Sequence, residues 1–205
     1  MRTLVIEAAT AACSVALIED GVVIDARHEI VGRGHAERLL PMIAELMDGG
    51  RAHAILVDCG PGSFTGIRVS LAAAHGLALG WGARVSGFSA LSLVAARALA
   101  DRPDLDALAV VMEGGHGEVF VQVFDAPLAP RGSFASLTPA AALDRLDQAL
   151  PIVGDGIRHL STSERAIEAR HPVAADAILL GHRDRNLAPT PIYGRAPDAK
   201  LPGQP

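Results

Sequence analysis

The segment whose residue types most clearly suggest chemistry is the glycine-rich run Gly60-Pro61-Gly62-Ser63-Phe64-Thr65-Gly66. It lies between a compact apolar run, residues 54–59, and a helical pattern over residues 65–79. Glycines let the backbone take positive φ and approach a ligand closely. The start of a helix offers unpaired N–H groups and a positive dipole end to an anion. The run therefore predicts either a phosphate cradle or a tight strand-to-helix connection.

The cradle would be built from the small and hydroxyl residues of this run, with the hydroxyls also able to cap the helix: Gly60, Gly62, Ser63, Thr65 and Gly66. A Walker loop requires a lysine and then a hydroxyl residue at its end. Ile67 and Arg68 stand there instead, which excludes that motif.

Two glutamates close apolar runs in the two halves of the chain. Glu7 ends the run of residues 3–7, and Glu113 follows the run of residues 108–112. In a two-lobed fold both strand ends would point into the cleft between the lobes. Carboxylates there could hold Mg²⁺ through water beside a nucleotide. The alternative, which we favour at this point, is that each glutamate is a solvated strand end.

The histidines and serines form no catalytic or metal-binding pattern. His35 and Glu37 open a helical segment but do not share a helix face, whereas helical metal ligands are spaced as in H-E-x-x-H. No G-x-S-x-G elbow is present. We predict no catalytic residue and no metal ligand. Glu37 is expected to favour the positive helix end, and His35 to cap the helix or contact a partner.

The helix predicted over residues 66–79 is rich in alanine and glycine. Small side chains let two helices approach closely, and a helix with so few polar positions can expose little of itself to water. It is therefore either the central helix of its domain or a helix with one side against another chain.

The scaffold that must position these residues follows from hydrophobic periodicity. Apolar runs bounded by turn residues predict strands at residues 3–7, 13–18, 22–27, 54–59, 85–88, 108–112, 119–124 and 152–154. Helical spacing predicts helices at residues 35–47, 65–79, 90–99 with Ser89 as N-cap, 139–150, 164–170 and 176–182. The first three strands should form an antiparallel meander.

The order of these elements predicts an α/β lobe with a mixed sheet, repeated in reduced form. Residues 101–106 carry four charges and a proline and are interpreted as the link between the lobes. The predicted domains are residues 1–103, with the glycine-rich loop, and residues 104–205, a shorter lobe. From residue 188 the chain contains five prolines and should lie extended along the surface.

Composition favours a globular, acidic protein. Half the residues are hydrophobic and the mean hydropathy is +0.30, so the chain is not disordered. The net charge is −5 and Lys200 is the only lysine, which argues against an RNA-binding protein that works alone. Cys13 and Cys59 predict buried free thiols. Neither a signal peptide nor a run of roughly 20 apolar residues is visible, so a cytoplasmic protein with no membrane contact is expected.

At this point the motifs resemble a known family. The loop, read on through Ile67 and Arg68, resembles the signature of the TsaB (YeaZ) proteins. Five further segments are similar to motifs of that family: His35-Ala36-Glu37-Arg38-Leu39-Leu40-Pro41, Ala74-His75-Gly76-Leu77-Ala78-Leu79, Gly87-Phe88-Ser89-Ala90-Leu91, Gly117-Glu118-Val119-Phe120 and Pro191-Ile192-Tyr193-Gly194-Arg195.

The resemblance implies a two-lobed actin-like, sugar-kinase-like fold of the ASKHA, ribonuclease-H-like class with mixed sheets. It implies a dimerisation or scaffold subunit without catalytic activity of its own, which pairs with a TsaD-type catalytic subunit. A TsaE-type ATPase joins them, and the complex transfers threonylcarbamoyl to a tRNA adenosine next to the anticodon. A self-dimer through the same surface is also implied. The expected interface residues are His35, Glu37, Leu40, Arg68, Leu71, Ala72 and His75.

Several positions depart from the family pattern. Glu7 and Glu113 stand where aspartates are usual, Gly115 replaces an arginine and Ala36 a serine. Glu7 and Glu113 are therefore expected to be vestigial cleft acids, and the glycine loop a vestigial phosphate site. ATP or ADP with Mg²⁺ is expected only at the level of the complex. The competing hypotheses are an independent ATP-binding kinase or ATPase of the same fold, and a metallopeptidase, for which we find no ligands.

Overall fold

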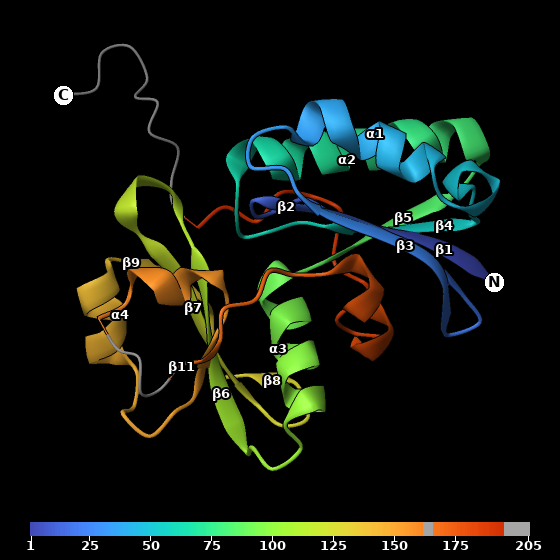
Figure 1. Ribbon diagram of the computed structural model, residues 1–205. Helices are drawn as coiled ribbons and strands as arrows, with labels where there is room; N and C mark the ends of the chain where they lie inside the picture. The colour runs from blue at the N-terminus through green and yellow to red at the C-terminus, as the bar shows by residue number, and fades with distance from the viewer. Residues whose placement is uncertain (162–165, 195–205) are drawn as a thin grey trace.

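The computed structural model describes residues 1–161 and 166–194. Its strands form two sheets, and helices cover both faces of the first (Figure 1). The strands are β1 (Arg2–Glu7), β2 (Ala12–Glu19), β3 (Val22–Ile30), β4 (Ala54–Asp58), β5 (Arg84–Phe88), β6 (Ala107–Glu113), β7 (Val119–Asp125), β8 (Ala129–Pro130), β9 (Ala135–Leu137), β10 (Ile152–Val153) and β11 (Ala166–Glu168). The α-helices are α1 (His35–Ala44), α2 (Phe64–Trp81), α3 (Ala90–Asp101) and α4 (Pro139–Arg145). Short 3₁₀ helices are η1 (Met47–Gly50), η2 (Gly115–Gly117), η3 (Asp155–His159) and η4 (Ala174–Leu179).

The first sheet has the order β3-β2-β1-β4-β5. β1 pairs with β2, and β2 with β3, in antiparallel register, which confirms the predicted meander. β4 lies parallel to β1, and β5 parallel to β4. Parallel neighbours bring the carboxyl ends of β1 and β4 to one edge of the sheet, where the glycine-rich loop begins.

Both faces of the first sheet are covered, which explains the continuous apolar runs of its central strands. Side chains alternate along β1: Leu4 and Ile6 pack into the cluster that includes α1 and α2. Val5 faces the opposite way and packs with residues of α3 and η4. All three are fully buried.

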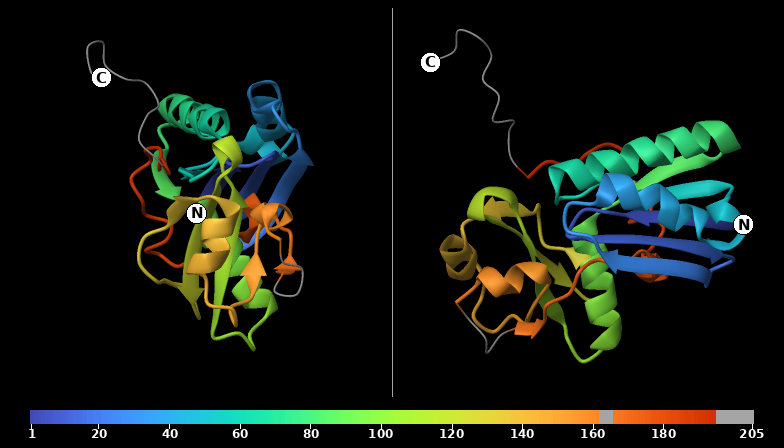
Figure 2. Two further views of the ribbon diagram at one scale, coloured as in Figure 1. Left: turned by 90° about the vertical axis from the view of Figure 1, so that its left-hand side faces the viewer. Right: turned by 45° about the horizontal axis from the view of Figure 1, so that its top comes forward.

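Helix α3 lies between the two sheets and joins their cores. α1 and α2 lie side by side on the other face of the first sheet (Figures 1 and 2). Leu91 and Val94 of α3 share one buried cluster with Leu108 and Val110 of β6. The two sheets are therefore held by a common apolar contact rather than by a linker alone.

The second sheet is built around the β6–β7 hairpin. Its order is β11-β10-β6-β7-β8, with β9 also paired to β7. β10 runs parallel to β6, and β11 parallel to β10. This hairpin ends in a tight turn of glycines and His116, which has φ 61°. The turn and the glycine-rich loop of the first half line the same cavity.

Three helical predictions in the second half need correction. The helix predicted over residues 164–170 is wrong, because residues 166–168 form β11 and pair with β10; residues 164–165 lie outside the described residues. α4 ends at Arg145, since Leu146 is extended and the Asp147 carboxylate accepts an N–H from Ala149 at 2.9 Å. The helix predicted over 176–182 is a 3₁₀ helix, η4, which ends at Leu179.

The predicted N-cap of α3 is confirmed in position only. Ser89 occupies the N-cap, but its side chain makes no capping hydrogen bond.

The proline-rich tail is described in part. Residues 188–194 have no regular secondary structure and run against the first sheet, where the Ile192 N–H donates to the Cys59 carbonyl at 2.7 Å. The rest of the predicted extended tail, residues 195–205, lies outside the described residues. The division into domains at residues 103 and 104 remains a proposal.

Candidate functional site

A cavity of about 910 Å³ lies between the two halves of the molecule. The β1–β2 turn and the loop after β3 form one wall, with the glycine-rich loop and the first turns of α2 beside them. The tip of the β6–β7 hairpin and residues 192–194 form the rest of the rim. The predicted cleft therefore exists, and the charged groups in its wall are the candidates for function.

The glycines of the loop permit close packing against the β1–β2 turn. A Cβ at Gly62 would lie 2.1 Å from the Ala9 carbonyl oxygen, and one at Gly66 would lie 1.9 Å from that of Ala8. Gly60 has φ +98°. At all three positions only glycine fits, because a Cβ would collide with backbone or require strained φ.

Three of the N–H groups of the loop are engaged inside the protein. Gly60 N–H donates to the Asp58 carboxylate at 2.7 Å and Ser63 N–H to the Ala9 carbonyl at 2.6 Å. Gly66 N–H donates at 3.2 Å to the Ser63 hydroxyl, which is the N-cap of α2. Thr65 is exposed. This geometry favours the tight strand-to-helix connection. The phosphate cradle remains a prediction.

Below the loop lies a buried pair of carboxyl groups, Glu7 and Asp58, both fully inaccessible. Glu7 ends β1 and Asp58 ends β4, and the residues just before them, Ile6 and Val57, are paired in the parallel register of these strands. Glu7 Oε1 accepts the Ala9 N–H at 2.7 Å, and Asp58 Oδ1 accepts that of Gly60. The remaining oxygens, Glu7 Oε2 and Asp58 Oδ2, have no partner from any other described residue, and the two carboxyls interact with each other.

Burial controls the protonation of this pair. Loss of hydration raises the pKa of Glu7 well above its usual range, and the charge of Asp58 raises it further. Burial also raises the pKa of Asp58 to about 7. Two carboxylates side by side cannot both ionise readily, so Glu7 keeps its proton when Asp58 ionises.

The two predicted cleft acids are in different places. Glu7 is not a solvated strand end, and it lies beneath the cavity rather than in its lining. Glu113 does line the cavity, where it pairs with Arg158 and lies 3.6 Å from His159 Nε2. Sequence reasoning missed Asp58, although it closes the strand that neighbours β1. Within residues 1–161 and 166–194, no three histidine, cysteine or acidic side chains gather in a way that could hold a metal ion.

The predicted interface residues divide into two groups. Five of them are exposed or lie on exposed helix positions: Glu37, Leu40, Arg68, Ala72 and His75. The other two side chains are buried within the chain itself, and their contact with a partner remains a prediction. His35 is 2% exposed, with Nε2 at 2.8 Å from the Thr10 carbonyl oxygen and 3.1 Å from that of Ala12. Leu71 is 6% exposed because it faces the core from α2.

A second hollow, of about 440 Å³, separates α1 from α2. Its lining is entirely apolar: Ala36, Leu39, Leu40, Val69, Ala72, Ala73, Gly76 and Leu77. Leu40, on its rim, is 53% exposed. The groove α1–α2, defined by these eight residues, is thus an apolar feature on the face of the first sheet that α1 and α2 cover.

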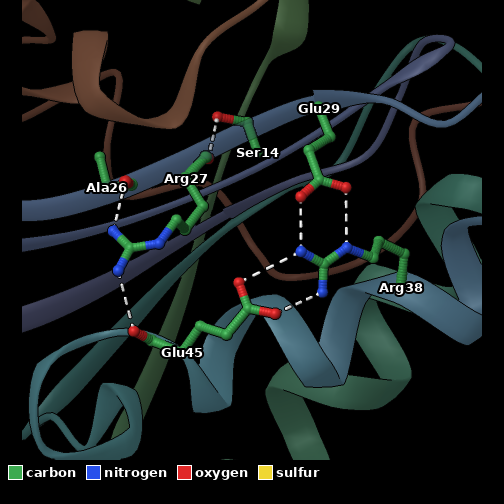
Figure 3. A network of polar contacts seen from close by, with 6 residues as sticks. All are labelled: Ser14, Ala26, Arg27, Glu29, Arg38 and Glu45. Atoms are coloured by element: carbon green, nitrogen blue, oxygen red, sulfur yellow. Dashed lines mark hydrogen bonds and ion pairs between the residues drawn. The ribbon is translucent and has the colours of Figure 1, made fainter.

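Ion pairs fix α1, one wall of this groove, to the sheet (Figure 3). Arg38 donates from Nε to Glu29 on β3 at 2.7 Å and from Nη1 to Glu45 at 2.6 Å. Arg27 donates to the Glu45 carbonyl at 3.0 Å. Hydrogen bonding to Arg38 lowers the pKa of both Glu29 and Glu45. The network joins β3 to the end of α1 and so holds the groove's shape.

An aromatic cluster that the sequence did not reveal stands at the mouth of the cavity. The Arg68 guanidinium lies 3.4 Å from the centroid of the Phe64 ring. Arg68 also donates from Nε and Nη2 to the Tyr193 hydroxyl at 3.1 and 3.0 Å. The Phe64 and Tyr193 rings are 5.8 Å apart. The sequence signal that could have drawn attention to this cluster is the low aromatic content, since Tyr193 is the only tyrosine of the chain.

Comparisons with known proteins decide the family. The family model described as "TsaD: tRNA N6-adenosine threonylcarbamoyltransferase" matches residues 23–172. The Escherichia coli protein described as tRNA threonylcarbamoyladenosine biosynthesis protein TsaB is 42% identical over 100 residues. YeaZ from Pseudomonas aeruginosa has a TM-score of 0.77 and 27% identity, over 94% of this chain and 99% of that chain. The chain belongs to the TsaB/YeaZ family.

The TsaB/YeaZ relationship confirms the family resemblance seen in the motifs. The match to the Escherichia coli TsaB spans 46% of this chain and 43% of that protein. The ethanolamine utilization protein EutJ from Carboxydothermus hydrogenoformans has a TM-score of 0.51 at 16% identity, which concerns the fold alone. The predicted α/β fold with mixed sheets, of the actin-like and sugar-kinase-like class, is confirmed. Among the helices of the described residues, none has the length and hydropathy needed to cross a bilayer.

Proposed function

We propose that this chain is a non-catalytic scaffold subunit of a cytoplasmic tRNA adenosine threonylcarbamoyltransferase complex, acting next to the anticodon. In this proposal its groove α1–α2 holds a TsaD-type catalytic subunit. A TsaE-type ATPase and the tRNA join at the level of the complex. The single observation that carries the proposal is the groove itself, an apolar hollow of about 440 Å³ between two helices.

The groove has the character of a protein interface. None of its eight lining residues is polar, although the hollow is open to solvent. Leu79, one turn beyond it on α2, is 89% exposed. Contiguous apolar surface of this kind on a soluble protein marks an interaction site. A partner that covers the groove would remove this apolar surface from water, and this would stabilise the complex.

Small residues on α2 would let a partner helix come close. Ala72, Gly76 and Gly80 are exposed and follow the helical spacing of one face. A Cβ added at Gly76 or Gly80 would meet no atom within 4 Å, so the surface there is open. A related two-lobed protein, or a second copy of this chain, could pack its own helix along this face.

The state of the cavity supports a scaffold rather than a catalyst. Each acid in its lining is held by a group of the same chain: Glu113 by Arg158, Asp155 by the Glu113 N–H at 3.0 Å, and Glu118 by the Ser136 hydroxyl at 2.5 Å. Three N–H groups of the glycine loop are likewise engaged. A general acid or base would need a free group within reach of a substrate.

The size of the cavity keeps one alternative open, an independent ATP-binding kinase or ATPase. A hollow of about 910 Å³ is large enough for a nucleotide. Titration of the lone chain with ATP and Mg²⁺ in a calorimeter separates the two functions. Micromolar binding followed by ATP hydrolysis would favour the alternative over the scaffold.

The scaffold function is tested by charging the groove. Ala72→Arg places a cation in the apolar lining, and we expect capture of a purified TsaD-type subunit to weaken by about tenfold or more. Ala100→Arg is the matched control, because Ala100 is also an exposed helical alanine, on α3. The control should bind as the unaltered chain does.

Activity provides the second readout. The lone chain should modify no tRNA, and modification should appear when the TsaD-type subunit, the TsaE-type ATPase and threonylcarbamoyl-adenylate are added. The proposal fails if Ala72→Arg binds and activates as well as Ala100→Arg. It also fails if the chain by itself transfers threonylcarbamoyl.

A further inference from the structure

The cavity mouth exposes aromatic rings in a chain that has few. The sequence contains five phenylalanines and one tyrosine. Phe88 and Phe124 are fully buried, whereas Phe64 is 56% and Tyr193 is 44% exposed. Exposing a large ring to water is unfavourable, so a pair of neighbouring exposed rings at a cavity is an unusual feature of this surface.

The two rings are held in place rather than free. Arg68 covers one face of Phe64 at 3.4 Å and donates two hydrogen bonds to the Tyr193 hydroxyl. The segment that carries Tyr193 is anchored at Ile192, whose N–H donates to the Cys59 carbonyl. The tyrosine ring is therefore oriented in advance, which reduces the entropy lost when a flat ligand stacks on it.

The lining of this cavity also carries positive charge that lies outside the ring cluster. Arg33 lines the same cavity and is exposed, and its side chain has no hydrogen bond or ion pair with any described residue. Glu113 is already paired with Arg158, and among the described residues no acid of the lining forms an ion pair with Arg33. A planar ring and a guanidinium without a partner among the described residues, both in the lining of one cavity, suit a ligand with a flat base and a phosphate.

We propose that this mouth is a binding site for one unpaired nucleotide of an RNA strand. The base stacks on the Tyr193 ring, and a phosphate pairs with Arg33, while Phe64 and Arg68 position the tyrosine. The assignment of RNA as the source of the nucleotide rests on the proposed function in tRNA modification.

The geometry favours an RNA nucleotide over free ATP. A triphosphate needs several free backbone donors, and those of Gly60, Ser63 and Gly66 are occupied. A nucleotide within a strand brings one phosphate for each base, which Arg33 can pair with. Stacking tolerates any base, because every base has a π face.

The only tyrosine of the chain makes the test direct. In full-length chain labelled at tyrosine, one set of ring signals reports Tyr193 alone. Adding a single-stranded RNA heptamer should move these signals upfield, while a duplex of the same sequence or ATP should move them far less. The proposal is overturned if the signals stay fixed at millimolar RNA. It is equally overturned if ATP shifts them as strongly and displaces the RNA.

Variants test the roles of the ring and the charge. Tyr193→Ala should weaken binding of a fluorescent heptamer roughly 5- to 100-fold, with thermal unfolding checked in parallel. Arg33→Gln, which lies outside the ring cluster, should reduce the slope of log affinity against log salt by about 0.7. Arg183→Gln, an exposed arginine that does not line the cavity, is the control. Unchanged affinity and slope in both test variants would refute the site.

The two proposals can fail separately. Ala72→Arg alters the groove and not the mouth, so it should lose the TsaD-type partner and keep the tyrosine shift. Loss of the shift with partner binding intact would refute only the nucleotide site. Partner binding that survives Ala72→Arg while the shift persists would refute only the scaffold function.

Discussion

The buried pair Glu7 and Asp58 should make the stability of this protein fall as pH rises. Both carboxyls bind their proton more tightly in the folded state than in the unfolded chain, because burial disfavours their charged forms. Where the folded state binds more protons, the free energy of unfolding decreases with pH. This contribution is complete below the ordinary pKa of Asp58, 3.8, and is lost as pH passes through its folded value of about 7.

The size of the effect follows from Asp58. A rise in pKa from 3.8 to about 7 is worth about 4 kcal/mol, because each pH unit contributes about 1.4 kcal/mol. Between pH 5 and pH 8 the share is about 3 kcal/mol, and Glu7 acts in the same direction. Asp58→Asn removes the ionisation of that residue but keeps an oxygen for the Gly60 N–H.

Urea unfolding at pH 5 and pH 8 measures this. From pH 5 to pH 8 the free energy of unfolding of the unaltered chain should fall by about 3 kcal/mol more than that of Asp58→Asn. Asp144→Asn, at an exposed position on α4, should follow the unaltered chain at both. Parallel profiles for Asp58→Asn and the unaltered chain would refute the raised pKa of Asp58, since Asp58 would then ionise as readily in the folded state as in the unfolded chain.

Three further changes test the local geometry. Gly66→Ala should lower the free energy of unfolding, measured in urea, by about 3 kcal/mol, because its Cβ would lie 1.9 Å from the Ala8 oxygen. Gly76→Ala, in open space on the same helix, should raise it by about 0.5–1 kcal/mol. Equal effects of the two substitutions would contradict the packing described. His35→Ala should lower the free energy of unfolding by about 1–3 kcal/mol, because the Thr10 and Ala12 carbonyls lose a partner. Capture of the TsaD-type subunit by the folded variant should not change. A loss of capture without a loss of stability would place His35 at the interface. Arg38→Met should lower the melting temperature at low salt, and the difference should shrink in 1 M NaCl because the ion pairs with Glu29 and Glu45 are screened; a difference independent of salt would indicate lost packing instead.

Local patterns were enough to predict much of the first half of the molecule. Turn residues such as Gly21 separate short apolar runs, and this determines the meander of β1, β2 and β3. The second half was predicted less well, because its elements are short: β11 has three residues, and only pairing with β10 distinguishes it from a helix. A few residues carry too little periodicity to decide between the two.

The sequence by itself predicted the fold class and the place of the glycine-rich loop, because both follow from the periodicity and turn residues of short segments. Only the tertiary structure decided how the functional side chains are used. Burial and the charge of Asp58 raise the pKa of Glu7, and Asp58 is its neighbour through the parallel pairing of β1 and β4. Tyr193 meets Arg68 across 125 positions of the chain, and no periodic pattern encodes such a contact. Burial and charge pairing depend on what the rest of the chain brings to a residue, so they are properties of the folded molecule.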